Sequence, residues 1–131
     1  MFWIKLDFHS GKPVYSQIRD NIIDDIIREK LKAEDPMPSI RELARILNIN
    51  PNTVARAYRE LESEGYIYSR PGVGSFIGSS AREKAQKTAE NIIFNDFIQV
   101  ARQAKKYHIS SREFTGLCNR VIKEVYGGDS E

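Results

Sequence analysis

Residues 38–76 constrain the fold of this chain more than any other stretch, because they contain two helix starts in close succession. Ser39 is a candidate N-cap, and Glu42 three residues later completes the sequence pattern of a capping box. Asn50 is a second candidate N-cap, and Pro51 takes the first helical position, where its missing N–H costs nothing. The stretch therefore predicts two short helices joined by a tight turn.

The second of these helices is predicted to run to about Glu64, with Gly65 ending it in a left-handed conformation. At ~100° per residue, its apolar residues share one face: Val54, Ala57, Tyr58 and Leu61. The opposite face is polar: Asn52, Arg56, Arg59 and Ser63. An amide and two guanidinium groups on an exposed face suit contacts to base edges and phosphates. The pair predicts a helix-turn-helix, although an ordinary helix pair with a solvated polar face has the same pattern.

A β-hairpin is predicted directly after the second helix. Residues 66–68 and 75–77 have the composition of strands, and residues 70–74 form a glycine-containing turn between them. A hairpin in this place is a wing, in which Gly72 lets the backbone approach DNA closely and Arg70 supplies positive charge. Glycine also serves plain hairpin geometry, so the turn alone does not establish DNA binding.

This stretch resembles the winged helix-turn-helix of GntR-type bacterial regulators. The residues that carry the resemblance follow one another in order: Pro38-Ser39-Ile40-Arg41-Glu42-Leu43-Ala44, Asn50-Pro51-Asn52-Thr53-Val54, Arg56-Ala57-Tyr58, Leu61-Glu62, Glu64-Gly65 and Arg70-Pro71-Gly72-Val73-Gly74-Ser75-Phe76. The match extends upstream through Pro13-Val14-Tyr15 and Gln17-Ile18. With its short C-terminal tail, the whole chain resembles the YtrA-like subfamily.

The resemblance implies a transcription regulator, a repressor, that binds an inverted-repeat operator in double-stranded DNA as a homodimer. The second helix would enter the major groove, and the hairpin would reach the minor groove or its phosphates. The DNA contacts implied are Ser39, Arg41, Asn50, Asn52, Thr53, Arg56, Arg59, Arg70 and Gly72. Among these, Arg41, Thr53 and Arg56 are the strongest candidates for DNA contacts, and Arg59 and Arg70 are expected to contact phosphates.

The chain departs from the family pattern at three positions. Glu29 and Glu34 stand near the two ends of the connection before the capping box, where the family carries glycine, so this loop is expected to take a different path. Ala55 follows the Thr-Val pair, where many relatives carry arginine. YtrA-like proteins tend to have a small residue and then a basic one here, as Ala55 and Arg56 do, so the contact set is carried over only in part.

A first helix is predicted to begin near Pro13. Its apolar residues recur at helical spacing: Val14, Tyr15, Ile18, Ile22, Ile23, Ile26 and Ile27. We expect this helix to pack across the helix-turn-helix as the third member of its core. Residues 2–6 either form a short strand or fold beneath this helix.

Two amphipathic helices are predicted after a short linker at 78–80. The first covers 81–107, and the second begins at a capping box of Ser110 and Glu113 and is ended by Gly127-Gly128. A hairpin of two such helices cannot bury both apolar faces alone.

The predicted fold class is therefore mainly α with a small β-hairpin, a winged helix-turn-helix followed by a two-helix C-terminal hairpin. We expect a DNA-binding domain at residues 1–78 and a helical dimerisation hairpin at 81–126. A simple extension of the DNA-binding core is the alternative for the hairpin.

Composition argues against several classes of protein. No apolar run approaches the ~20 residues of a membrane span, and the first residues lack the pattern of a signal peptide. The single cysteine, Cys118, allows no internal disulfide, so a cytoplasmic location is expected. The net charge of +2 is a weak nucleic-acid signature, so DNA binding must depend on where the arginines are placed.

No enzyme is predicted, and no cofactor or metal. His9 and His108 are far apart, and Cys118 lies on an apolar stripe, where a core role is expected. The glycines at 72 and 74 lie between strands, unlike a phosphate-binding loop.

Any unidentified small-molecule effector is expected between domains or protomers, because the tail is too short to enclose a cavity of ~300 Å³. The main alternative function is a winged-helix protein-interaction module without specific DNA binding. Such surfaces usually expose aromatic residues, whereas the second helix of the motif exposes Asn52, Arg56 and Arg59.

Overall fold

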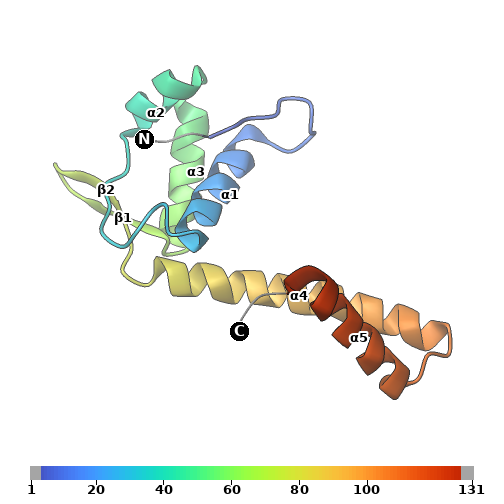
Figure 1. The fold of residues 1–131 in the computed structure, drawn as a ribbon. Coiled ribbons are helices and arrows are strands. Elements are labelled where there is room, and N and C mark those ends of the chain that lie inside the picture. The colour runs from blue at the N-terminus through green and yellow to red at the C-terminus, as the bar shows by residue number, and fades with distance from the viewer. Residues whose placement is uncertain (1–3, 128–131) are drawn as a thin grey trace. The chain divides into compact units, whose positions relative to one another are not determined.

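A computed structural model describes residues 4–127 of the chain, which form helices and one antiparallel hairpin (Figure 1). In chain order the elements are α1 (Val14–Ile27), α2 (Ile40–Leu47), α3 (Pro51–Ser63), β1 (Ile67–Arg70), β2 (Gly74–Ile77), α4 (Ala81–Lys106) and α5 (Ser111–Tyr126). This order confirms the predicted fold class, mainly α with a small β-hairpin.

Contacts divide the chain into two compact units, Met1–Ala89 and Glu90–Glu131. The division falls inside α4, so the first turns of α4 belong to the first unit. Ala81 and Ala85 of those turns are buried in its core.

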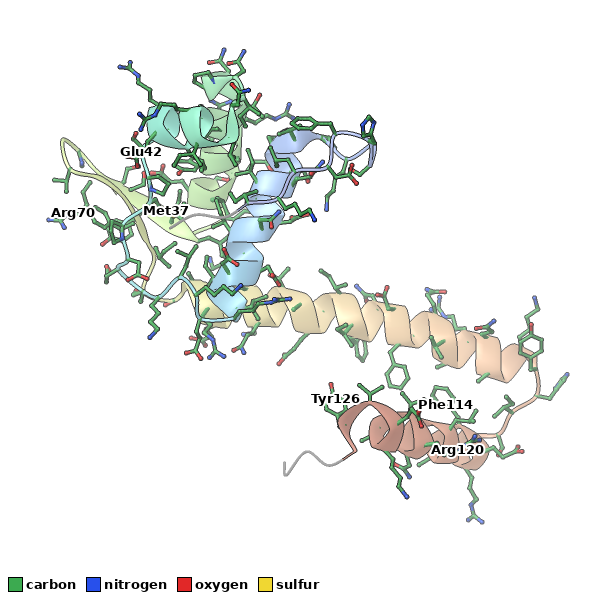
Figure 2. All side chains as sticks on the ribbon, turned by 45° about the horizontal axis from the view of Figure 1, so that its top comes forward. Met37, Glu42, Arg70, Phe114, Arg120 and Tyr126 are labelled. Atoms are coloured by element: carbon green, nitrogen blue, oxygen red, sulfur yellow. The ribbon has the colours of Figure 1, made fainter. Side chains whose placement is uncertain are left out.

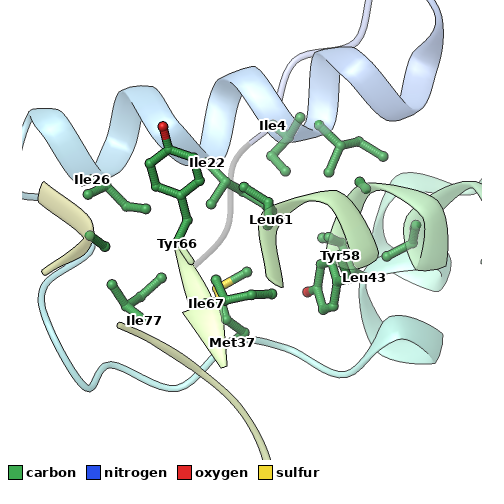
Figure 3. Packing of buried hydrophobic residues seen from close by; sticks show 14 of the residues in the cluster. Ile4, Ile22, Ile26, Met37, Leu43, Tyr58, Leu61, Tyr66, Ile67 and Ile77 are labelled. Atoms are coloured by element: carbon green, nitrogen blue, oxygen red, sulfur yellow. The ribbon is translucent and has the colours of Figure 1, made fainter. Parts of the chain in front are cut away.

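The core of the first unit lies where α1, α3 and the hairpin meet (Figure 3). Its fully buried large side chains are Tyr66, Ile18, Ile22, Ile26, Leu43, Leu61, Ile77 and Val54. The predicted apolar face of the second helix of the motif is confirmed, since all four of its residues are buried on α3. The remaining apolar residues of α1 are partly buried and pack against this cluster. Ile4 is also a core residue, whereas Phe2 and Trp3 lie outside the described residues.

Gln17 is a buried polar residue that the apolar pattern of α1 did not predict. Its amide nitrogen donates to the backbone oxygens of Asp7 (2.8 Å) and Lys12 (2.9 Å), and its amide oxygen accepts from the Asp7 N–H at 2.8 Å. Because buried amides are costly unless paired, these bonds fix the segment before α1 against the helix.

Hydrogen bonds at the helix starts agree with most of the predicted caps. The Ser39 hydroxyl accepts from the Glu42 N–H at 3.0 Å, but the return bond of the predicted capping box is not formed. The Asn50 side chain accepts from the Asn52 N–H at 2.8 Å. At the start of α5, both bonds of the capping box between Ser110 and Glu113 are present. The hydrogen bond that the Glu113 carboxylate accepts from the Ser110 backbone N–H lowers the pKa of Glu113.

The hairpin pairs β1 with β2 in the register Ile67↔Ile77 to Arg70↔Gly74. The strands run further toward the turn than the sequence predicted, and Tyr66 precedes β1 as a buried core residue. The segment 34–37 lies along the other edge of β2, through the Met37 N–H to the Ser75 oxygen (2.8 Å) and the Ile77 N–H to the Asp35 oxygen (2.9 Å). This pairing covers an edge that would otherwise be open.

Glu29 and Glu34 both adopt the left-handed backbone conformation, with φ of 62° and 71°. Glycine enters this region without a Cβ penalty, which is the physical reason for glycine in the family pattern at these places. Glu34 gains a partner there, since the Tyr68 hydroxyl donates to its carboxylate at 2.5 Å. This hydrogen bond raises the pKa of Tyr68.

The second unit consists of the C-terminal part of α4 and all of α5. The rings of Phe97 and Phe114 lie with centroids 5.7 Å apart, and Figure 2 shows Phe114 on the side of α5 that faces α4. α5 has no buried residue. It ends at Tyr126, followed by Gly127, while Gly128 of the predicted glycine pair lies outside the described residues.

Tyr58 links α3 to the segment before α2, because its hydroxyl donates to the Pro38 carbonyl oxygen at 2.7 Å. Burial raises the pKa of this hydroxyl, and the negative charge of Glu42 adds to the effect. Above the ordinary tyrosine pKa of ~10, the unfolded chain therefore loses this proton while the folded chain keeps it.

We expect Tyr58→Phe to lower the free energy of unfolding at neutral pH by about 0.5–1.5 kcal/mol, because one hydrogen bond is removed. As the pH rises above 10, the unmodified protein should lose stability relative to the variant by up to ~1.4 kcal/mol per pH unit, because only its unfolded state releases the Tyr58 proton. Urea titrations at several pH values measure both effects, with the exposed Tyr107→Phe as control. A stability difference that stays constant from pH 8 to pH 11 would contradict this.

Candidate nucleic-acid interface

The exposed ridge of α3 carries the polar face that the sequence predicted. Asn52, Arg56, Arg59 and Ser63 are all exposed, and Thr53 beside them is half-buried. Asn50, at the N-cap, is exposed too, and its amide nitrogen is not used by the cap. The ridge therefore presents amide and guanidinium donors from the N-terminal half of a helix that is fixed on its other side by the core.

α2 adds a second group of exposed cations. Arg41 and Arg45 lie one turn apart, and neither makes an ion pair with any residue in 4–127. Ser39 is exposed at the helix start. The sequence did not lead us to include Arg45 among the candidate DNA contacts. Its i,i+4 spacing from Arg41 places both arginines on the same side of an amphipathic helix, and this spacing was a signal for it.

The wing places Arg70 at the end of β1, where it projects from the hairpin (Figure 2). Its guanidinium carbon lies 5.4 Å from the centroid of the Phe76 ring. Gly72, at the tip, has a φ of 75°, and a Cβ built there would meet no atom within 4 Å. Backbone conformation is therefore what requires glycine at this position, and the absence of a side chain leaves the backbone accessible to a partner.

Three glutamates follow the arginines of α3 and limit the basic surface. Glu62 accepts a hydrogen bond from the Ser69 hydroxyl of β1 at 3.1 Å. On the other side, Arg19 of α1 donates to both carboxylate oxygens of Glu64, at 2.8 and 2.5 Å, and lies 3.7 Å from Glu60. The hydrogen bond to Glu64 raises the pKa of Arg19, so this cation is committed to α3. The part of the ridge from Asn50 to Arg59 is thus the part suited to an anionic partner.

Arg56 is exposed but not extended into solvent. Its guanidinium carbon lies 3.8 Å from the centroid of the Tyr15 ring, and its Nε lies 3.9 Å from Glu60. Sequence reasoning missed the contact with Tyr15, because the two residues are far apart in the chain and nothing local joins them. Arg59, by contrast, has no ion-pair partner within the described part of the chain.

The described residues of the first unit include a larger and a smaller hollow. The larger, of about 550 Å³, is a shallow depression beside Arg59 and its neighbours on the exposed side of α3. The smaller, of about 260 Å³, is lined by the end of α1, the following loop and the start of α4, with Lys32 and Arg82 among its residues. It is below the ~300–1,000 Å³ typical of small-molecule sites.

No group of three or more metal-ligating side chains occurs among the described residues. None of the helices that the structure describes is long and apolar enough to cross a membrane. Cys118 is half-buried on α5.

Comparison with known proteins matches residues 14–77 to the family described as "Bacterial regulatory proteins, gntR family". The transcriptional repressor YtrA of Bacillus subtilis is 42% identical over 125 residues, which cover 95% of this chain and 96% of YtrA. Two other curated regulators match at 43% and 41% identity, over 61% and 62% of their own length. These relatives are regulators of transcription and not enzymes.

Among solved structures, a transcriptional regulator from Oenococcus oeni has a TM-score of 0.77 at 32% identity, covering 92% of this chain and 99% of that one. The DNA-binding domain of AraR, solved in complex with its operator ORE1, has a TM-score of 0.50 at 27% identity, covering 60% of this chain and 95% of that one. A domain similar to part of this chain has thus been solved with an operator bound.

Proposed function

This chain belongs to the gntR family of bacterial regulatory proteins, and from that membership we propose that it represses transcription by binding an inverted-repeat operator as a homodimer. Similarity to the repressor YtrA over nearly the full length of both chains supports repression. A repressor of this kind acts where bacterial DNA lies, in the cytoplasm.

The observation that carries the proposal is the exposed N-terminal half of α3. N-terminal residues of a recognition helix are those that meet base edges in the major groove. Arg56 has the two-pronged donor geometry that guanine accepts, and Asn52 has the amide that adenine accepts. Arg59 lies further along the same ridge, where a phosphate contact is expected.

The remaining residues of the proposed contact set lie on three elements. Ser39 and Arg41 bring the start of α2 to the phosphate backbone, where a helix N-terminus favours an anion. Arg70 and Gly72 of the wing reach the minor groove or its phosphates. At the start of α3, Asn50 precedes Asn52, and Thr53 lies between Asn52 and Arg56.

The apolar surface of α4 and α5 supports a homodimer. Apart from Phe8, Ile46 and Val73, every exposed large hydrophobic residue within 4–127 lies on these two helices or directly after α4. Those residues are Ile92, Ile93, Phe94, Phe97, Val100, Tyr107, Leu117, Val121, Ile122, Val125 and Tyr126. An exposed apolar surface of this extent marks an interaction site. We propose residues 81–126 as the dimerisation element, attached to the DNA-binding domain at 1–78.

An effector, if the regulator has one, is proposed to bind between domains or protomers. The 260 Å³ hollow next to Arg82 in the first unit is small for such a ligand. The alternative of a protein-interaction module is weaker, because the exposed ridge of α3 carries Asn52 and Arg59 and no aromatic residue.

The proposed readout separates two arginines. Arg56→Ala should flatten base preference at one symmetric pair of operator positions, at a cost of ~1–3 kcal/mol per half-site. Arg59→Ala should weaken binding to all sequences about equally and lower the salt slope by ~1 for each phosphate that is no longer neutralised. Binding titrations on a footprinted duplex from upstream of the chain's own gene, with single-base variants and varied salt, measure both. Base preference that survives Arg56→Ala but disappears in Arg59→Ala would show that the recognition face is assigned wrongly.

The proposed dimer predicts a specific response to charge on α4. Ile93 is 65% exposed, and Ile93→Asp should convert the dimer to monomer, because the carboxylate would have to lose its hydration at the interface. Operator affinity should then fall steeply, since the two half-sites are no longer bound together. The matched control is Asn95→Asp, exposed and ~200° around the same helix. Light scattering that finds the unmodified chain monomeric at high micromolar concentration would rule the dimer out.

A further inference from the structure

The contact between Arg56 and Tyr15 joins the ridge of α3 to α1. The guanidinium carbon of Arg56 lies 3.8 Å from the centroid of the Tyr15 ring, within the range of a cation–π contact. More than half of the Arg56 side chain remains exposed, at 56%. The guanidinium is therefore held in one place while it stays accessible to a partner.

Tyr15 is itself fixed by its surroundings. It is half-buried and packs against the hydrophobic core of the first unit. One turn further along α1, Arg19 is bound to Glu64 at the end of α3, which holds the two helices together. The tyrosine ring thus belongs to the packed core, and the largely exposed Arg56 side chain lies against it.

The two interactions of Arg56 use different parts of the guanidinium. A ring lying over the guanidinium carbon contacts the face of the planar group. A forked hydrogen bond to guanine uses the N–H donors at its edge. The Glu60 carboxylate lies 3.9 Å from Nε, beyond hydrogen-bond distance. Arg56 can therefore keep the ring contact while it donates to a base.

We propose that Tyr15 is a positioning residue for sequence readout, which holds the Arg56 guanidinium in the orientation from which it bonds to guanine. This rests on the proposed function, because it needs Arg56 to read a base. Arginine has a long side chain whose ordering opposes binding, and a guanidinium already stacked on a fixed ring loses less freedom when it reaches the base. Tyr15 makes this contribution from outside the helix-turn-helix.

The test compares Tyr15→Leu, which removes the ring and keeps apolar volume, with Tyr15→Phe, which keeps the ring face. The probe is a duplex recovered from a randomised pool by the unmodified full-length chain, with single-base substitutions at each position. Tyr15→Leu should reduce discrimination at the Arg56 position by about 2- to 5-fold per half-site, the size of an exposed cation–π contact. Discrimination elsewhere and the salt slope should not change, and Tyr15→Phe should behave like the unmodified protein.

The Arg56→Ala variant separates the two levels of the proposal. Adding Tyr15→Leu to Arg56→Ala should change base preference no further, because the positioned group is already gone. If Arg56→Ala flattens the preference but Tyr15→Leu leaves it intact, the positioning role is overturned and the proposed readout stands. If Arg56→Ala itself has no effect, the readout assignment fails and the positioning role fails with it.

Two other results would also overturn the positioning role. An equal reduction at every operator position in Tyr15→Leu would mean a structural role, and a gain in discrimination would mean that the ring competes with DNA. An NMR measurement on the unmodified protein and on Tyr15→Phe tests the same contact and does not depend on the folding of the Leu variant.

The ring-current shift of the Arg56 Cδ protons in NMR spectra should persist when the duplex binds. Disappearance of that shift in the complex would show that the guanidinium leaves the ring.

Discussion

The packing of α1 against α3 is the interaction on which the rest of the first unit depends. Ile18, Ile22 and Ile26 from α1 are fully buried against the core that also holds Val54 and Leu61 of α3. Burial of each such side chain contributes about 1.5–3 kcal/mol, more than any surface ion pair in the unit. This packing leaves one side of α3 exposed. It also brings the ring of Tyr15 on α1 to the edge of that side, where the ring contacts Arg56.

Local sequence signals predicted the elements and the exposed face because their causes are local. The caps at Ser39 and Asn50 and the apolar period of α3 require only neighbouring residues. The contacts that were missed join distant segments: Gln17 with the chain before α1, the strand-like pairing of 34–37 with β2, and Tyr15 with Arg56. No short-range pattern encodes these contacts, so the positions of candidate residues were predictable while their partners were not.

The two units solve the burial of apolar surface in different ways. In the first unit, three helices, the hairpin and the first turns of α4 enclose one core, and its buried amide is fully paired. In the second unit, α5 buries no residue, and Phe97 of α4 remains 48% exposed although its ring lies against that of Phe114. Two helices present too little surface to one another to enclose a core, so a further surface packed against them would supply the burial that this unit lacks by itself.

The order of charges along α3 has a kinetic consequence. The helix begins with the positive end of its dipole and carries Arg56 and Arg59 before Glu60, Glu62 and Glu64, which Arg19 only partly neutralises. Near a polyanion one end of the helix is attracted and the other repelled, so the molecule experiences a torque before any contact forms. Collisions in the reversed orientation are disfavoured, and a larger share of encounters becomes productive. This steering raises the association rate at low ionic strength and weakens as the Debye length shortens.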